Sequence, residues 1–219
     1  MLPDGITACL FDLDGVLTNT AAVHARAWKK TFEAHGYPFD ERADYDRYVD
    51  GKSRDDGIRD FLASRDVHPS EEEVAKLGEE KNELVLRLIH EDGVEAFDDA
   101  RRFLEQLKMP CAVVSSSHNA REVLEATGLD RFIEALVDGH VKDELGLRGK
   151  PAPDMFLEGA KRLGVEPAHA AVFEDAQAGV AAGRAGKFGF VVGVDRVGQR
   201  EALLEHGADV VVAELTELL

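Results

Sequence analysis

A short apolar run that ends in two closely spaced acids constrains this chain more than any other feature. Residues 6–11 (Ile-Thr-Ala-Cys-Leu-Phe) have the length and composition of a buried strand. Asp12 and Asp14 follow at once, and Gly15 then allows the chain to turn. Two carboxylates held where apolar packing stops are costly unless a cation lies beside them. The pair indicates either a solvated turn or a metal site in which Asp12 attacks a substrate.

Short apolar runs alternate with helical segments from residue 95 onward. The apolar runs, which we interpret as strands, cover residues 111–114, 133–137, 170–173, 188–194 and 210–212. The helices predicted between and before them cover residues 98–108, 120–127, 154–163, 176–185 and 200–206. This alternation predicts an α/β fold, a Rossmann-like parallel sheet with helices on both faces, and the first strand belongs to the same sheet.

Residues 20–90 differ, because they show helical patterns and no convincing strand. Helices are predicted at 20–35, at 53–64 with Ser53 as the N-cap, and at 71–89 after a Ser70-x-x-Glu73 capping box. Residues 37–50 show no pattern that assigns them to a helix or a strand. We therefore expect a helical cap domain, residues 20–90, inserted into a core domain of residues 1–19 and 91–219.

The charge balance narrows the partners that this chain can have. It holds 26 basic and 43 acidic residues, a net charge of −17, which disfavours nonspecific binding to nucleic acid or to anionic membranes. No signal peptide and no apolar run of membrane-spanning length is apparent. Cys9 and Cys111 lie in apolar runs and are expected to be buried free thiols. We expect a cytoplasmic monomer that acts on a small molecule.

The residues directly after the strands are the candidates for the site, because ligands of such sheets bind at the carboxyl ends of the strands. They are Asp12, Asp14, residues 115–119 and the pair Glu174-Asp175, with Lys150 before a helix in the same half. Each has an ordinary alternative: Ser115 as a helix cap, Lys150 as a solvated side chain, Glu174-Asp175 as a loop. Their shared location favours a phosphoryl-transfer site instead. Mg²⁺ takes oxygen ligands, and a serine and a lysine suit a phosphate.

Four motifs in this order resemble those of the haloacid dehalogenase superfamily. They are Asp12-x-Asp14-Gly15-Val16-Leu17-x-x-Thr20, the strand-end Ser115, Lys150-Pro151-x-Pro153-Asp154 and Glu174-Asp175-x-x-x-Gly179. The resemblance covers essentially the whole chain. An acid two residues after Asp12, here Asp14, resembles the pattern of the phosphatase and mutase branches. The dehalogenases and phosphonatases lack that acid, so the resemblance disfavours them. The resemblance implies Mg²⁺ as cofactor and an aspartyl-phosphate on Asp12.

Three cap motifs resemble the β-phosphoglucomutase-like subfamily: His24-x-x-x-Trp28, Gly51-x-Ser53-Arg54 and Lys81-Asn82. The resemblance implies that Asp12 takes and returns the phosphoryl group and that Asp14 is the general acid and base. Thr20 and His24 would influence Asp14 and the hinge that leads into the cap domain. The implied metal ligands are Asp12, Asp14, Glu174 and Asp175, and the implied substrate or phosphate contacts are Trp28, Gly51, Arg54, Lys81, Ser115, Ser116, Asn119 and Lys150.

The resemblance implies that Arg54 binds the distal phosphate of a sugar bisphosphate and that Lys81 contacts the sugar. It also implies that Ser115 and Lys150 bind the phosphate being transferred. A mutase needs the second anion contact, and an arginine can bind phosphate through two hydrogen bonds. Ordinary alternatives remain for the cap: Arg54 as a surface ion pair, His24 as an exposed helix residue and Trp28 as core.

The main hypothesis is a mutase that interconverts β-glucose 1-phosphate and glucose 6-phosphate through the 1,6-bisphosphate. The alternative is a phosphatase acting on a sugar or polyol phosphate, favoured by Asp50 and His118, which stand where the mutase pattern commonly has lysines. A third hypothesis is a non-catalytic phosphosugar-binding protein. The intact set of Asp12, Asp14, Ser115, Lys150 and Asp175 argues against that third hypothesis.

Overall fold

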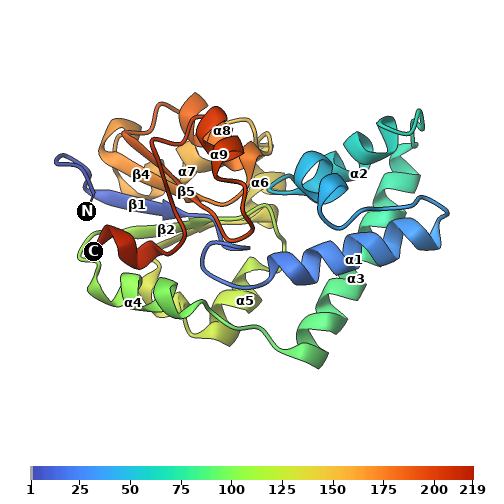
Figure 1. The fold of residues 1–219 in the computed structure, drawn as a ribbon, viewed down its shortest axis with the longest axis horizontal. Coiled ribbons are helices and arrows are strands. Elements are labelled where there is room, and N and C mark those ends of the chain that lie inside the picture. Colours follow the sequence, from blue (N-terminus) through green and yellow to red (C-terminus); the bar gives the residue numbers. More distant parts are fainter. Residues whose placement is uncertain (1) are drawn as a thin grey trace.

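One sheet of six parallel strands forms the base of the structure, a computed structural model that describes residues 2–219. The strands lie in the order β3-β2-β1-β4-β5-β6, so β1 and β4 are at the centre (Figure 1). Their bounds are β1 Ala8–Phe11, β2 Cys111–Val114, β3 Ala135–Val137, β4 Ala170–Glu174, β5 Phe190–Val194 and β6 Val210–Val212. The predicted Rossmann-like parallel sheet is confirmed.

Helices cover both faces of this sheet, as the alternating pattern predicts. The helix α4 (Asp98–Gln106), the helix α5 (Ala120–Thr127) and the 3₁₀-helix η4 (Leu215–Leu218) pack on the face that carries Phe11 and Phe173. The helices α7 (Asp154–Leu163), α8 (Gln177–Ala185) and α9 (Arg200–Glu205) pack on the face that carries Leu10 and Val172. Successive residues of each strand therefore enter opposite cores.

Four helical elements between residues 21 and 92 lie beside the sheet rather than on it (Figure 1). They are α1 (Ala21–Ala34), the π-helix η1 (Tyr45–Val49), α2 (Arg54–Ala63) and α3 (Glu71–Asp92). Their apolar side chains form two clusters, one around Phe32 and Phe61 and one around Ala27 and Val85. The boundaries 20 and 90 of a separate cap domain stay a prediction.

Local signals place the starts of these helices. The Ser53 side chain accepts a hydrogen bond from the backbone N–H of Asp56, and Ser70 and Glu73 form the predicted reciprocal capping box. The helix α3 continues to Asp92, three residues beyond its expected end. Acids in the first turns of α2 and α3 also interact favourably with the helix dipoles.

The short elements are where the structure goes beyond the sequence prediction. The helix α6 (Gly139–Leu145), the 3₁₀-helices η2 (Asp130–Phe132), η3 (Pro167–His169) and η4, and the π-helix η1 were not predicted. All span seven residues or fewer, which is too short for an apolar period to show. The strands β1, β3 and β5 are also two residues shorter at their starts than the predicted runs.

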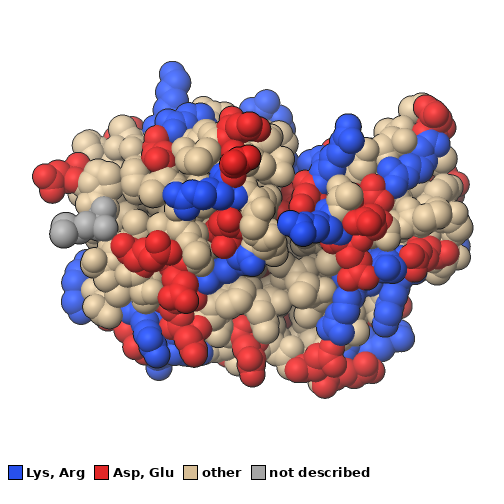
Figure 2. All heavy atoms as spheres, in the orientation of Figure 1, with Lys and Arg blue, Asp and Glu red and all other residues tan. Residues whose placement is uncertain are grey.

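Acidic and basic side chains are interspersed over the face shown in Figure 2. The same face is notched at the top, between the sheet and the helices of residues 21–92. Within residues 2–219, every helix is too short or too polar to cross a lipid bilayer.

The central strands depend on aromatic packing, and this generates a stability prediction. Phe11 is fully buried, stacks on Phe173 with ring centroids 4.5 Å apart, and meets Phe103 edge-on. Replacing Phe11 by Ala leaves a cavity and is expected to lower the free energy of unfolding by about 3–5 kcal/mol in a urea titration. As a control, Leu145→Ala at an exposed position should change it by no more than about 0.5 kcal/mol.

Candidate active site

The turn after β1 brings acids from two strands together. Asp12 and Asp14 follow the strand, and the Gly15 N–H donates to the Thr18 carbonyl at 2.8 Å, which closes the turn. Gly15 has φ of +88°, and a Cβ atom there would lie 1.9 Å from Oδ2 of Asp175. Only glycine leaves room for this approach. The carboxylate that follows β4 therefore lies directly against the turn that follows β1.

A buried ammonium group joins the ends of three strands. Lys150 Nζ donates to Asp12 Oδ1 at 2.5 Å, to Glu174 Oε1 at 2.6 Å and to the Val114 carbonyl at 3.1 Å. Burial alone would lower the pKa of Lys150, but the two carboxylates raise it above its usual value. Burial raises the pKa of Glu174 to about 7 even with this partner. Three donor protons and three acceptors are thus matched within the core.

The cluster holds more negative charge than Lys150 can balance. Burial raises the pKa values of Asp12, Asp14 and Asp175, and Lys150 opposes this shift in all three. Neighbouring acids raise the pKa values of Asp12 and Asp175 further. With Glu174 included, three buried carboxyl groups and the partly exposed one of Asp14 lie near one ammonium group. Additional positive charge at this place would lower the electrostatic energy, so the donor set suits a cation or a site where a proton is held.

Asp14 is contacted from both sides of the turn. The Thr20 hydroxyl donates to Asp14 Oδ1 and lies 2.8 Å from the hydroxyl of Thr18. The Ser115 hydroxyl donates to Asp14 Oδ2 at 3.4 Å, and His24 Nε2 lies 3.5 Å from Oδ1. Its carboxyl group is therefore held in one orientation by groups from β2, from the turn and from α1.

A polar chain continues from Asp14 to the helix α3. Lys81 Nζ lies 2.7 Å from Nδ1 of His24 and 4.7 Å from the centroid of the Trp28 ring. Burial lowers the pKa of Lys81 to about 7. Burial, with Lys81 as a second cause, lowers the pKa of His24 well below its ordinary value. Both groups release a proton more easily here than in water.

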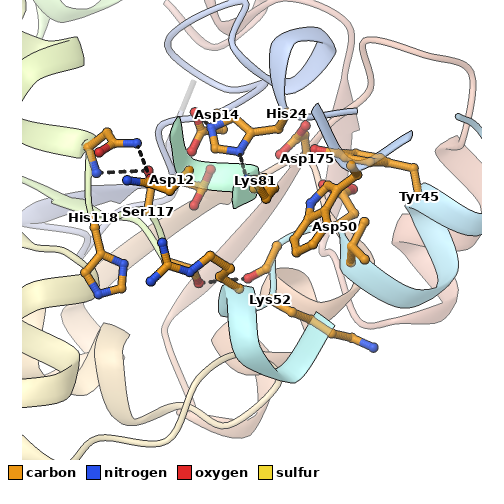
Figure 3. A pocket seen from close by; sticks show the side chains of 17 residues that line it. Asp12, Asp14, His24, Tyr45, Asp50, Lys52, Lys81, Ser117, His118 and Asp175 are labelled. Atoms are coloured by element: carbon orange, nitrogen blue, oxygen red, sulfur yellow. Dashed lines mark hydrogen bonds and ion pairs between the residues drawn. The ribbon is translucent and has the colours of Figure 1, made fainter. Parts of the chain in front are cut away.

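A cavity connects these groups to the helices of residues 21–92 (Figure 3). Its empty space, including the part that is open to solvent, is about 630 Å³. It is lined by Asp12, Asp14, His24, Trp28, Tyr45, Val49, Asp50, Gly51, Lys52, Arg54, Lys81, Asn82, Ser116, Ser117, His118, Asn119 and Asp175.

Small polar contacts close the cavity between its two walls. The Ser116 hydroxyl donates to the Gly51 carbonyl at 2.9 Å, and Asn119 Nδ2 donates to Asn82 Oδ1 at 2.9 Å. Gly51 has φ of +68°, and a Cβ atom there would lie 2.8 Å from the Cβ of Ala176. The chain approaches the sheet end this closely because position 51 has no side chain.

Basic side chains line another part of the cavity. His118 Nε2 lies 2.8 Å from Asp143 Oδ2, and Lys52 Nζ donates to Asp60 at 2.7 Å. The Arg54 Nε is buried and has no hydrogen-bond partner among residues 2–219, although it lies 3.8 Å from Oδ1 of Asp55, at the distance of a long ion pair. A buried guanidinium nitrogen without a partner is costly, and an anionic ligand in the cavity would satisfy it.

The structure brings the predicted site residues together in two shells. Ten line the cavity: Asp12, Asp14, His24, Trp28, Gly51, Arg54, Lys81, Ser116, Asn119 and Asp175. Thr20, Ser115, Lys150 and Glu174 lie behind them and contact Asp12 or Asp14 directly or through Lys150. The sequence analysis did not choose Tyr45, Val49, Lys52 or Ser117, and the first two fall in a stretch with no readable pattern.

Comparisons with known proteins agree with this arrangement. Residues 6–187 match the model of the family described as haloacid dehalogenase-like hydrolase. The chain is 51% identical to a β-phosphoglucomutase of Mycobacterium bovis over 244 aligned residues, which cover 100% of this chain and 93% of that protein. It is 34% identical to a validoxylamine A 7′-phosphate phosphatase of Streptomyces hygroscopicus subsp. limoneus, over 95% of this chain and 94% of that protein.

Among solved structures, a β-phosphoglucomutase of Clostridium difficile superposes with a TM-score of 0.84 at 31% sequence identity. The match covers 98% of this chain and 93% of that one. The fold and the whole length of the chain are therefore shared with enzymes that carry out phosphoryl transfer.

The Lys150 ion pairs generate a stability prediction. The Lys150→Met variant leaves two carboxyl groups buried without their cation, and we expect the free energy of unfolding to fall by about 3–5 kcal/mol. Urea titration without added metal ions measures this loss. Adding Glu174→Gln to the variant should recover part of it, since one buried charge is then removed. As a control, Lys161→Met on the exposed surface of α7 should change stability by no more than about 0.5 kcal/mol.

Proposed function

This chain belongs to the haloacid dehalogenase-like hydrolase family, and we propose that it interconverts β-glucose 1-phosphate and glucose 6-phosphate. The identity with a β-phosphoglucomutase over the full length supports this proposal. The geometry of the cavity supports it independently, because one wall carries closely spaced carboxyl groups and another carries Arg54, whose buried Nε has no hydrogen-bond partner among residues 2–219.

The proposed chemistry starts at Asp12. Its carboxylate oxygen attacks phosphorus, an aspartyl-phosphate forms, and the bond from phosphorus to the sugar oxygen breaks. Asp14 gives its proton to that oxygen, and its raised pKa supports the role of a group that holds a proton. Lys150 and Ser115 lie where they would stabilise charge on the transferred phosphoryl group.

The return step uses the same groups in reverse. A hydroxyl at the other end of the sugar gives its proton to Asp14, its oxygen attacks the phosphoryl group, and Asp12 is released as a carboxylate. Thr20 and His24 would hold Asp14 in the orientation that both steps need. Lys81 and Trp28 line the path between the two ends.

Mg²⁺ is the proposed cofactor. The excess of buried carboxyl groups fits a divalent cation, and Asp12 and Asp175, with Glu174 and the backbone of Asp14 nearby, would hold it. No group of three or more acidic, His or Cys side chains within residues 2–219 forms a cage by itself. Mg²⁺ commonly takes one or two carboxylates and completes its shell with water and substrate phosphate. When bound, it would neutralise charge on the phosphoryl group.

Arg54 is the observation that carries the mutase proposal rather than the phosphatase alternative. Arg54 lines the same cavity as Asp12, and its buried Nε has no hydrogen-bond partner among residues 2–219. A sugar bisphosphate has a second phosphate to place beside this guanidinium group. The phosphatase relative and the acid at position 50 favour the alternative, a sugar or polyol phosphate phosphatase. A phosphosugar is the ligand in both cases.

Residues 20–90 would act as a cap that opens for exchange of the sugar and closes during transfer. The contacts of Gly51 with Ser116 and of Asn82 with Asn119 support this role, because they seal the cavity that must exclude water from the aspartyl-phosphate. A cytoplasmic location and a monomeric state stay predictions from the sequence.

A primed assay tests the proposed function. With β-glucose 1-phosphate, Mg²⁺ and catalytic amounts of β-glucose 1,6-bisphosphate, we expect glucose 6-phosphate to accumulate and steady release of inorganic phosphate to stay minor. Both products are measured in the same tube, with Asp12→Asn as the blank. Steady phosphate release without glucose 6-phosphate would establish the phosphatase instead.

The second anion contact is tested at Arg54. Its replacement by Ala removes a charged hydrogen-bonding partner, so we expect the KM for the bisphosphate to rise by about 10- to 100-fold. Hydrolysis of acetyl phosphate, which has no second phosphate, should change by less than about threefold. Arg59→Ala, an exposed arginine of the same helix paired with Glu71, is the control. Equal losses with both substrates would contradict a role at a distal phosphate.

A further inference from the structure

The chain enters the helices of residues 21–92 by one segment and leaves them by another, and the two segments are hydrogen-bonded to each other. The Asn19 N–H donates to the Glu95 carbonyl at 3.1 Å, and the Phe97 N–H donates to the Leu17 carbonyl at 3.0 Å. The residues between these two pairs form an antiparallel bridge. We call the two paired segments, residues 17–19 and 95–97, the linker ribbon. Any rotation of the helices relative to the sheet bends this ribbon.

A single arginine from the C-terminal part of the chain contacts both segments. Arg196 follows β5, and its Nη2 donates at 3.2 Å to the carbonyl of Val16, the residue directly before the ribbon. Its guanidinium carbon lies 4.2 Å from the centroid of the Phe97 ring, which is the distance of a cation–π contact. The Arg196 side chain is only 16% exposed, so water competes little for these contacts. One planar group therefore touches both the incoming and the outgoing segment.

The guanidinium group is itself fixed to the core. Nη2 of Arg196 also donates to Asp99 Oδ2 at 2.9 Å, and Nη1 donates to the Ala213 carbonyl at 3.0 Å. Asp99 lies in the first turn of α4, and its Oδ2 accepts a hydrogen bond from the Leu215 N–H of η4 at 2.7 Å. Both of these helices pack on the sheet. Arg196 thus connects the linker ribbon to two fixed elements of the core.

The arginine contributes direction more than stability. Its Nε is buried and has no hydrogen-bond partner in the part of the chain that the structure describes, which is a cost. Well-packed apolar side chains in place of a buried ion pair are often as stable or more so. What an apolar side chain cannot supply is a rigid plane with donors aimed at Val16, Asp99 and Ala213 while its face lies on a ring.

The segment that Arg196 reaches also orients the acids of the site. Val16 belongs to the turn that carries Asp14, and the Thr20 hydroxyl at the end of this segment donates to the Asp14 carboxyl group. His24 of α1 lies 3.5 Å from the same carboxyl group. The position of this segment therefore decides where Asp14 lies relative to the helical wall of the cavity.

We propose that Arg196 is a positioning residue, which fixes the linker ribbon to the core so that the helices of residues 21–92 close over the carboxyl groups in one orientation. Arg196 acts through Val16 and Phe97 and lies outside the set of residues that line the cavity. The inference rests on the proposed function where it concerns closure over an aspartyl-phosphate. The anchoring of the ribbon is independent of the reaction.

Hydrogen exchange followed by NMR tests the anchoring without substrate. The Arg196→Lys variant keeps a positive charge beside Asp99 but loses the planar group. We expect the amide protons of Asn19 and Phe97 to exchange about tenfold faster or more, because their hydrogen bonds open locally. The Cys9 amide, bonded to the Pro110 carbonyl at 3.0 Å, should change by less than about threefold.

Arg200→Lys is the matched control for exchange. Arg200 lies four residues further along and donates at 2.7 Å to the Val211 carbonyl of β6, so its replacement should leave the Asn19 and Phe97 amides unchanged. Equal acceleration of the Cys9 and linker amides in Arg196→Lys would mean that Arg196 only stabilises the fold. Unchanged linker amides would mean that the ribbon holds itself. Either result overturns the anchoring.

The ratio of two products tests the role in closure. A poorly anchored cap admits water to the aspartyl-phosphate, so in the primed assay we expect the ratio of inorganic phosphate to glucose 6-phosphate to rise at least about threefold in Arg196→Lys. Arg200→Lys should keep the ratio of the unmodified protein. Loss of folded enzyme lowers both products together, and an unchanged ratio in Arg196→Lys would overturn the role in closure.

The two measurements separate this inference from the proposed function. If the unmodified protein forms no glucose 6-phosphate, the proposed function fails and the role in its closure fails with it, whereas hydrogen exchange still decides whether Arg196 anchors the ribbon. If glucose 6-phosphate forms and neither the exchange rates nor the product ratio respond to Arg196→Lys, only this inference fails. Melting temperatures close to that of the unmodified protein show that the variants are folded.

Discussion

The buried ammonium group of Lys150 is the interaction on which the rest of the site depends. It binds the carboxyl group that follows β1, the carboxyl group of the last residue of β4 and the last carbonyl of β2, so three neighbouring strands end at one point. Without this charge, Asp12 and Glu174 would repel each other in a place without water. Lys150 therefore makes a dense group of acids compatible with a folded core, and the remaining negative charge is what a cation would bind.

The two parts of the cavity wall contribute different kinds of interaction. The sheet ends supply fixed charges that are held by buried partners, as Asp12 is by Lys150 and Asp14 by Thr20. The helical wall supplies groups whose partners are incomplete, such as Arg54 Nε within the described chain, or that meet like charges, such as Asp50. Reaction type thus follows from the sheet ends, whereas the choice of ligand depends on the groups that still need a partner.

The sequence predicted the sheet and its carboxyl-end residues well, because strand ends converge in a parallel sheet regardless of what lies between them in the chain. Lys150 was placed correctly at the rim, but its ion pair with Glu174 depends on tertiary packing that no local pattern encodes. Tyr45 was missed because it lies in a five-residue π-helix without apolar periodicity. Asp50 was interpreted only as a departure from the mutase pattern, because sequence alone could not show that its side chain lines the cavity.

The contacts that join the helical wall to the sheet ends have a consequence for how such a protein can change over generations. The helices of residues 21–92 keep apolar clusters of their own, and Gly51 and Asn82 meet the sheet side through single hydrogen bonds. Substitutions along that wall can therefore accumulate without disturbing the packing around Phe11 or the charges around Lys150. A lineage can acquire new substrates by altering the third of its gene that encodes this wall while the remainder, which holds the reacting groups, stays unchanged.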